Sequence, residues 1–182
     1  MLCPIVTNLD NNIFRRLALD VSREFKNVRV TVDSSQHQYY SGAEIQSAFD
    51  KLRNQWNSDK LLGVLSKKLN QDLETKFLFI YDADAYSSSL NFVFGESASN
   101  GSLAIVYLAR LRQEYYGLPP NQNLFYERMV KESIHELGHV FGLNHCSNTT
   151  CMMYFSNSLQ DTDKKERRFC ENCRHVLVEA LR

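Results

Sequence analysis

The stretch HELGHVFGLNHC, from His135 to Cys146, is the feature that most constrains what this chain can fold into. His135 and His139 are four residues apart in a segment of helical hydrophobic spacing, so both imidazoles are expected on one face of a helix. Gly142 follows the last expected turn, where a glycine can adopt the left-handed conformation that ends a helix. We expect the resulting chain reversal to bring His145 back towards the other two histidines.

Three histidines gathered in this way predict a zinc site of the catalytic type. Neutral imidazoles are zinc ligands, and three of them leave the fourth tetrahedral position open for water. Glu136 adjoins the first histidine and is not needed as a ligand, so we expect it to act as general base. The alternative is a surface helix with incidental histidines, and the fixed offsets of Gly142 and His145 disfavour it.

Four of the five cysteines form two close pairs. Cys146 and Cys151 enclose four residues, and Cys170 and Cys173 enclose two. Two close pairs are typical of a closed zinc site with four thiolate ligands. The alternatives are two disulfides or buried free thiols. Because Cys146 directly follows His145, a structural zinc would pin the third catalytic ligand. Cys3 has no partner in the sequence and is expected to be structural or incidental.

Charge and hydropathy exclude several other classes of protein. The 182 residues include 21 basic and 21 acidic side chains, and this balance argues against a broad nucleic-acid-binding surface. The longest apolar runs are too short to cross a bilayer, which argues against a membrane protein. The segment MLCPIVTNLDNN lacks the apolar stretch of a secretory signal. We therefore expect a cytoplasmic protein, and in a reducing compartment paired cysteines more often bind metal than form disulfides.

Alternating helical and strand patterns predict an α/β (α+β) fold with a mixed twisted sheet and packed helices. Helices are expected at Phe14–Phe25, from Gly42 to Trp56, at Leu61–Leu69, at Leu124–Phe141 and near the C-terminus. Strands are expected at Val28–Val32, Lys76–Tyr81, Asn91–Phe94 and Leu103–Ala109. The segment GESASNG, between the last two strands, is rich in turn residues and is expected to be a loop.

The chain from Glu127 onwards resembles the archaemetzincins (archaelysins), a family of metzincin zinc metallopeptidases. The resemblance rests on HELGHVFGLNHC, on the C-x4-C spacing from its last residue, on a nearby methionine and on the C-x2-C downstream. It implies a metzincin-like fold with an active-site helix and a small C-terminal lobe stapled by zinc. We therefore expect one metallopeptidase domain, 1–182, with an N-terminal lobe at 1–142 and a C-terminal lobe at 143–182. The second lobe would hold the Met-turn, the four-cysteine site and the last helix.

The resemblance also implies the role of each metal ligand. His135, His139 and His145 would hold a catalytic zinc, and the four paired cysteines would hold a structural zinc, giving two ions per chain. Met153 falls at the place of the Met-turn methionine, a hydrophobic floor beneath the metal. Without the resemblance it would be taken for ordinary core filling.

Two further roles concern the substrate. Some metzincins stabilise the tetrahedral intermediate with a tyrosine two residues after that methionine, where this chain has Phe155. Tyr154 is a weak candidate for the same task, and the sequence identifies no other donor. Metzincin resemblance suggests that Ser102–Tyr107 is an edge strand beside the cleft, to which a peptide could add as an extra strand.

These observations predict a zinc-dependent peptidase that hydrolyses peptide bonds in peptides or proteins. The alternative is a noncatalytic, zinc-stabilised peptide-binding protein on the same fold, which the intact Glu136 disfavours. A zinc-ribbon nucleic-acid module would leave the histidine cluster unexplained. His37 and His175 are expected to be ordinary histidines, and the run Lys164–Arg168 a solvated charged segment.

Overall fold

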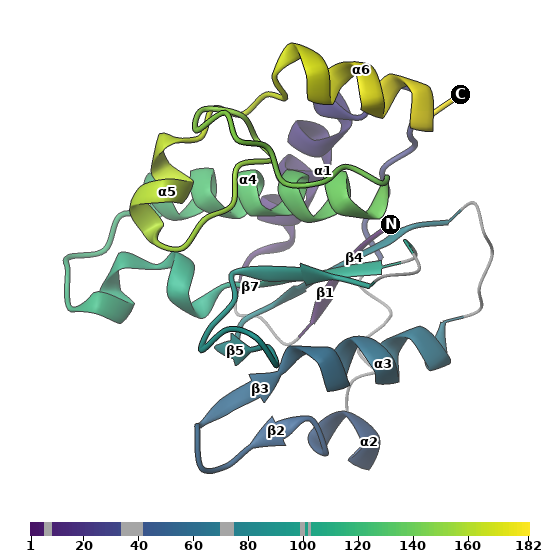
Figure 1. The fold of residues 1–182 in the computed structure, drawn as a ribbon. Coiled ribbons are helices and arrows are strands. Elements are labelled where there is room, and N and C mark those ends of the chain that lie inside the picture. Colours follow the sequence, from purple (N-terminus) through teal and green to yellow (C-terminus); the bar gives the residue numbers. More distant parts are fainter. Residues whose placement is uncertain (6–8, 34–41, 70–74, 99–100, 102) are drawn as a thin grey trace.

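The computed structural model describes residues 1–5, 9–33, 42–69, 75–98, 101 and 103–182, and it contains a mixed four-stranded sheet. This sheet lies at the centre of the molecule (Figure 1). The strand order is β1-β4-β7-β6, with bounds Leu2–Ile5, Phe77–Tyr81, Leu103–Tyr107 and Gly95–Ser97. Strands β1, β4 and β7 are parallel, and β6 pairs with β7 in the antiparallel sense. All residues of β4 and β7 are buried, as expected of parallel strands covered on both faces.

Two hydrophobic cores lie on the two faces of this sheet. Leu78 and Ile80 of β4 face the core shared with α1 (Asn11–Glu24) and α4 (Gln122–Val140). Phe77, Phe79 and Tyr81 alternate with them and face the core shared with α3 (Ser58–Lys68). Figure 1 accordingly shows α4 and α3 on opposite sides of the sheet.

The remaining elements extend this layered arrangement. A second sheet has the order β2-β3-β5. Its strands are β2 (Phe49–Asp50), β3 (Gln55–Asn57) and β5 (Ala85–Tyr86), and α2 (Ala43–Gln46) precedes them. Two 3-10 turns, η2 (Ala109–Leu111) and η3 (Gln113–Tyr116), lead towards α4. The chain after α4 contains α5 (Leu159–Lys164) and α6 (Glu171–Ala180), and α6 lies beyond α4 at the top of Figure 1.

The helix expected from Gly42 to Trp56 is wrong beyond Gln46. The chain instead forms a hairpin in which Phe49 pairs with Trp56. The Asp50 carboxylate accepts hydrogen bonds from the backbone of Leu52 and Arg53, and Asn54 has a φ of 53°. These local side-chain bonds offer the backbone an alternative to helix, which the hydrophobic spacing alone could not reveal.

Two strand predictions are also wrong. Val28–Val32 forms no strand, and only Val32 makes an isolated bridge, to Leu2. The strand expected at Asn91–Phe94 lies instead at Gly95–Ser97, within the segment taken for a loop. The prediction that Ser102–Tyr107 is an edge strand is also wrong. Its described part, β7, pairs with β4 on one side and with β6 on the other. Ser102 itself lies outside the described residues. The edge strand on that side of the sheet is β6.

Helix α4 forms and ends where the sequence predicts. The Asn121 side chain accepts from the backbone N–H of Leu124 and caps its start. At its end Gly142 has a φ of 87°, and its N–H donates to the carbonyl of His139. The N–H of Leu143 donates back to the carbonyl of Gly138, so the chain reverses within one turn.

The run Lys164–Arg168 is not wholly solvated, because Lys165 is only 2% exposed. Its ammonium donates to Glu132 Oε1 at 2.9 Å, and the Thr162 hydroxyl donates to the same oxygen at 3.0 Å. Glu132 lies on α4 and is itself 3% exposed. This buried ion pair therefore fastens the end of α5 to α4.

Replacing Lys165 by Met should lower the free energy of unfolding by about 3–5 kcal/mol, because Glu132 would remain charged and buried without its partner. Urea unfolding followed by circular dichroism measures the change. Lys164→Met is the matched control, since Lys164 is exposed, and it should change the free energy of unfolding by less than about 0.5 kcal/mol. Equal effects of the two substitutions would contradict the ion-pair interpretation.

Candidate metal centres and cleft

The three histidines of the opening motif meet at one point. One ring nitrogen from each of His135, His139 and His145 lies within 4.8 Å of the others. The Nε2 atoms of His135 and His139 are 3.1 Å apart. Helix α4 supplies these two side chains, and the reversal at Gly142 supplies the third. Convergent imidazole nitrogens of this kind fit a zinc ion.

Backbone carbonyls fix the orientation of two of these rings. Nδ1 of His135 lies 2.9 Å from the carbonyl oxygen of Met152, and Nδ1 of His139 lies 2.7 Å from that of Leu143. A carbonyl can only accept a hydrogen bond, so each Nδ1 carries the proton and donates it. Each Nε2 therefore keeps its lone pair, which is directed to the point where the rings meet.

The protonation states of the buried groups follow from desolvation. Burial lowers the pKa of His135 well below its usual range, and the nearby Lys165 charge adds to this shift. Burial likewise lowers the pKa values of His139 and His145. Neutral imidazole is the form that binds metal. Burial raises the pKa of Glu136 well above its usual range, with a smaller contribution from the Glu132 charge.

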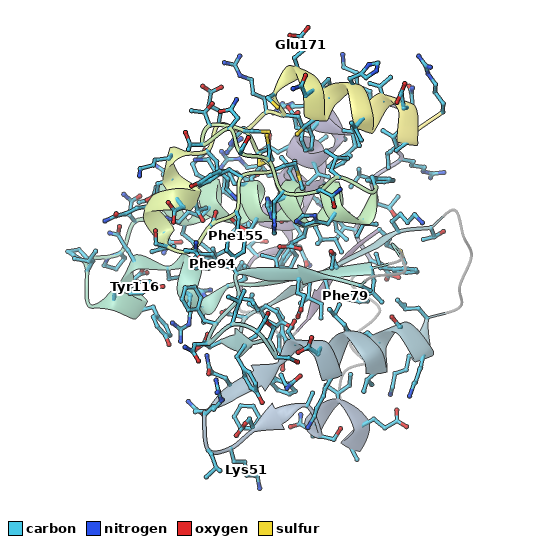
Figure 2. The ribbon with its side chains drawn as sticks, viewed as in Figure 1. Lys51, Phe79, Phe94, Tyr116, Phe155 and Glu171 are labelled. Atoms are coloured by element: carbon cyan, nitrogen blue, oxygen red, sulfur yellow. The ribbon has the colours of Figure 1, made fainter. Side chains whose placement is uncertain are left out.

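A cavity of about 480 Å³ opens onto the histidines. Its walls come from β6 and the segment before it, from α4, and from the chain that leads into α5. The lining residues include Phe94, Gly95, Glu132, Glu136, Phe155 and Ser156. Figure 2 shows Phe94 and Phe155 in the space between the main sheet and α4. Because the three histidines line the same cavity, a ligand there would reach all of them.

Glycine at position 95 permits the close approach of β6 to Glu136. A Cβ placed on Gly95 would lie 2.7 Å from Glu136 Oε1 and 2.8 Å from its Cδ. Glu136 is only 5% exposed, and β6 covers its side chain at Gly95. The backbone of β6 therefore limits the position of the Glu136 carboxylate on this side.

The four cysteines form a second cluster. The sulfur atoms of Cys146, Cys151, Cys170 and Cys173 all lie within 4.8 Å of one another, and none of the four is in a disulfide. The backbone N–H of Cys173 and bonds from the neighbouring thiols lower the pKa of Cys170 to about 7. Four convergent cysteine sulfur atoms are the donor set of a closed tetrahedral zinc site.

The segment Cys151–Met153 connects the two clusters. Cys151 contributes a thiol to the second cluster, and the next residue, Met152, supplies the carbonyl that orients His135. Met153 packs beneath α4, where a Cβ on Gly138 would overlap its sulfur atom. Met153 is fully buried.

The other candidates that the structure describes are absent from the cavity wall. His37 lies outside the described residues. His175 is on α6, with its ring beside Glu179. Tyr154 is half-buried and does not appear in the cavity wall. Sequence reasoning missed Glu132, although it is one helical turn before His135 and Glu136 and its spacing could have indicated it. It also missed Gly95, for which the sequence carries no signal.

Three convergent imidazoles beside a buried carboxylate, open to a cavity, are typical of a zinc-dependent hydrolase. Comparison with known proteins gives the family. Residues 6–179 match the model of peptidase family M54. The archaemetzincin of Saccharolobus solfataricus is 37% identical over 97% of this chain and 92% of its own length. That of Methanocaldococcus jannaschii is 46% identical over 69% of this chain and 68% of its own length.

Solved structures agree with this assignment. The archaemetzincin of Methanopyrus kandleri superposes with a TM-score of 0.78 at 32% identity, over 99% of this chain and 94% of that one. A zinc-dependent peptidase from Methanocorpusculum labreanum gives 0.81 at 29% identity, over 97% and 98%. The chain belongs to peptidase family M54. It is a zinc metallopeptidase with the mixed α/β fold that the sequence predicted.

Substituting Gly95 by Ala should lower kcat/KM for peptide cleavage roughly 10- to 100-fold, because the new methyl group displaces the Glu136 carboxylate and such misplacements are costly. Gly63→Ala is the control. A Cβ there meets nothing within 4 Å, so cleavage should be unchanged while α3 becomes more stable by about 0.5–1 kcal/mol. Undiminished cleavage by the Gly95 variant would show that the carboxylate position is not set by β6.

Proposed function

We propose that His135, His139 and His145 hold a catalytic zinc ion in this peptidase and that Glu136 is its general base. The observation that carries the proposal is the meeting of the three imidazoles at a cavity whose wall also contains the Glu136 carboxylate. Zinc bound there would polarise the scissile carbonyl and lower the pKa of a water to about 7.

Glu136 moves the proton in this proposal. Its carboxylate takes a proton from the attacking water and delivers it to the amine nitrogen that leaves as the peptide bond breaks. The contact with Gly95 and the burial of the side chain keep the carboxylate beside the histidines. A Glu136 carboxylate that is already in position need not move before it accepts the proton.

The substrate is a peptide or a flexible protein segment, and β6 is the element that would hold it. This short strand is at the edge of the main sheet, and its residues line the cavity beside the histidines. An extended peptide can pair with the free side of such a strand through backbone hydrogen bonds. In this proposal the strand that binds the peptide is Gly95–Ser97, in place of the predicted Ser102–Tyr107.

The cysteine cluster supports a second, structural zinc ion. Four thiols meet between the chain reversal after α4 and the start of α6. We infer that residues 1–142 and 143–182 are two lobes of one catalytic domain, with this ion holding the second lobe in shape. The four thiols, none of them in a disulfide, also support the expected cytoplasmic location. Within the described residues, no helix combines the length and the apolar character needed to cross a membrane.

Replacing Glu136 by Gln tests the proposed base and separates the peptidase from a protein that merely binds peptides. The amide keeps the shape but cannot accept the proton, so kcat should fall by about 10²- to 10⁴-fold. Cleavage of a peptide library measured by mass spectrometry gives the rate, and metal analysis should show unchanged zinc content. Glu44→Gln, on the surface of α2, is the control and should cleave normally. Equal cleavage by the Glu136 variant and the wild type would show that Glu136 is not the general base.

Metal analysis of the purified chain should give two zinc ions per molecule. Graded chelation should remove the ion at the histidines first, because four thiolates bind zinc more strongly than three imidazoles. That step should abolish cleavage with little change in the thermal midpoint, and loss of the second ion should unfold the C-terminal lobe. His139→Gln should reduce the count to one. Two tightly held ions in that variant would contradict the assignment of the histidine site.

A further inference from the structure

Exposed apolar side chains gather at one side of the cavity. Among the described residues, four of the exposed large apolar side chains are Leu90, Tyr115, Tyr116 and Leu118, with exposed fractions between 37% and 56%. Leu90 is in the cavity wall, and the other three are in η3 or just after it. The remaining ones are scattered over α1, the β2–β3 hairpin and α6.

A row of packed side chains connects η3 with the cavity. Phe94 and Phe92 both line the cavity, and their ring centroids are 5.3 Å apart. The Arg110 guanidinium lies 4.6 Å from the centre of the Phe92 ring and 4.8 Å from that of the Tyr115 ring. Tyr116 packs against Tyr115, with centroids 5.2 Å apart. The row therefore leads from the cavity wall to the exposed surface, and Tyr116 lies to the left of Phe94 in Figure 2.

Hydrogen bonds hold this row in place. The Asp84 carboxylate accepts two bonds from Arg110, at 2.6 and 3.0 Å, and one from the Tyr115 hydroxyl at 2.9 Å. The Gln55 amide donates both to Asp84 and to the backbone carbonyl of Asn91, a residue of the cavity wall. Because the Tyr115 ring is already held, a side chain that packs on it loses little affinity to ordering of the protein.

The row lies where an extended peptide would leave the cavity. Strand β6 begins at Gly95, and Phe92 and Phe94 directly precede it in the chain. A peptide paired with β6 would continue past this segment on one side of the scissile bond. Extended chain advances about 3.3 Å per residue, so the three contacts from Phe94 to Tyr115, each about 5 Å, span at most about five residues of a peptide.

The exposed end of the row favours an apolar partner. Tyr115 and Tyr116 are each 46% exposed, and half-exposed aromatic rings fixed in place suit large apolar or aromatic side chains. The Arg110 charge is compensated by Asp84. The row therefore has no uncompensated charge that would select an acidic or basic residue.

We propose that Tyr115 and Tyr116 form a secondary substrate-binding surface, which holds a large apolar or aromatic side chain of the peptide about three to five residues from the scissile bond. This inference rests on the proposed peptidase function. The contact is distant from the reacting atoms, so it stabilises the bound substrate and the transition state equally. Such a contact lowers KM and leaves kcat unchanged.

The test uses zinc-loaded protein and two sets of peptides. A six-residue peptide that is cleaved at its central bond is compared with versions extended by four residues at either end, with tryptophan or glycine at each added position. For the wild type, a tryptophan extension at one end should lower KM roughly 5- to 20-fold, and the glycine extension should not. Cleavage of the short peptide supplies the reference kcat and KM.

Tyr116→Ala should lose most of the gain in KM from the tryptophan extension while it cleaves the short peptide with unchanged kcat and KM. Tyr116→Phe, which keeps the ring, should retain the gain. Leu52→Ala is the control, because Leu52 is fully exposed on the β2–β3 hairpin, and it should behave as the wild type.

Three results would overturn the proposed surface while the peptidase function stands. The first is a tryptophan extension that lowers KM at neither end, or a gain that Tyr116→Ala retains. The second is an equal loss for short and long peptides in Tyr116→Ala, which would assign the effect to the cavity. The third is a wild-type dimer that Tyr116→Ala converts to a monomer in size-exclusion chromatography, because a second copy of the chain would then cover the surface. A wild type that cleaves no faster than Glu136→Gln would overturn the proposed function and, with it, this inference.

Discussion

The packing of the segment Cys151–Met153 against α4 is the contact on which the rest of the site depends. Gly138 has no side chain, and only for that reason can the sulfur of Met153 reach the helix. The same approach brings the carbonyl of Met152 to His135, which fixes the ring and its proton. Since Cys151 belongs to the thiol cluster, one short turn joins the two candidate metal centres.

Buried charges restrict how the segments around α4 can pack. Lys165 and Glu132 form an ion pair with almost no exposure, and Glu136 is buried one turn away. Removing one partner would leave the other charge buried and unpaired, so the pair and its hydrogen bonds favour this arrangement of α4 and α5. The result is a low-dielectric cleft in which a carboxylate and three neutral imidazoles face the same space.

The sequence predicted correctly those elements that depend on neighbouring residues, and it failed where distant segments decide the structure. Helix α4, its glycine stop and the buried strands β4 and β7 were confirmed, because periodicity and capping are properties of neighbouring residues. The hairpin at Phe49–Trp56 was missed because its hydrophobic spacing also fits a helix, and the bonds of Asp50 decided against helix. The edge strand was misplaced because the order of strands in a sheet is a long-range property.

The sequence by itself determined the chemistry: which side chains could bind metal, which carboxylate stood beside them, and where the helix would turn back. These follow from spacing along one helix and from the conformational freedom of Gly142. Only the tertiary structure decided that β6 borders the cleft, that Gly95 must lack a side chain opposite Glu136, and that Lys165 lies inside. These facts arise where segments far apart in the chain come within van der Waals distance, and no local pattern records such distances.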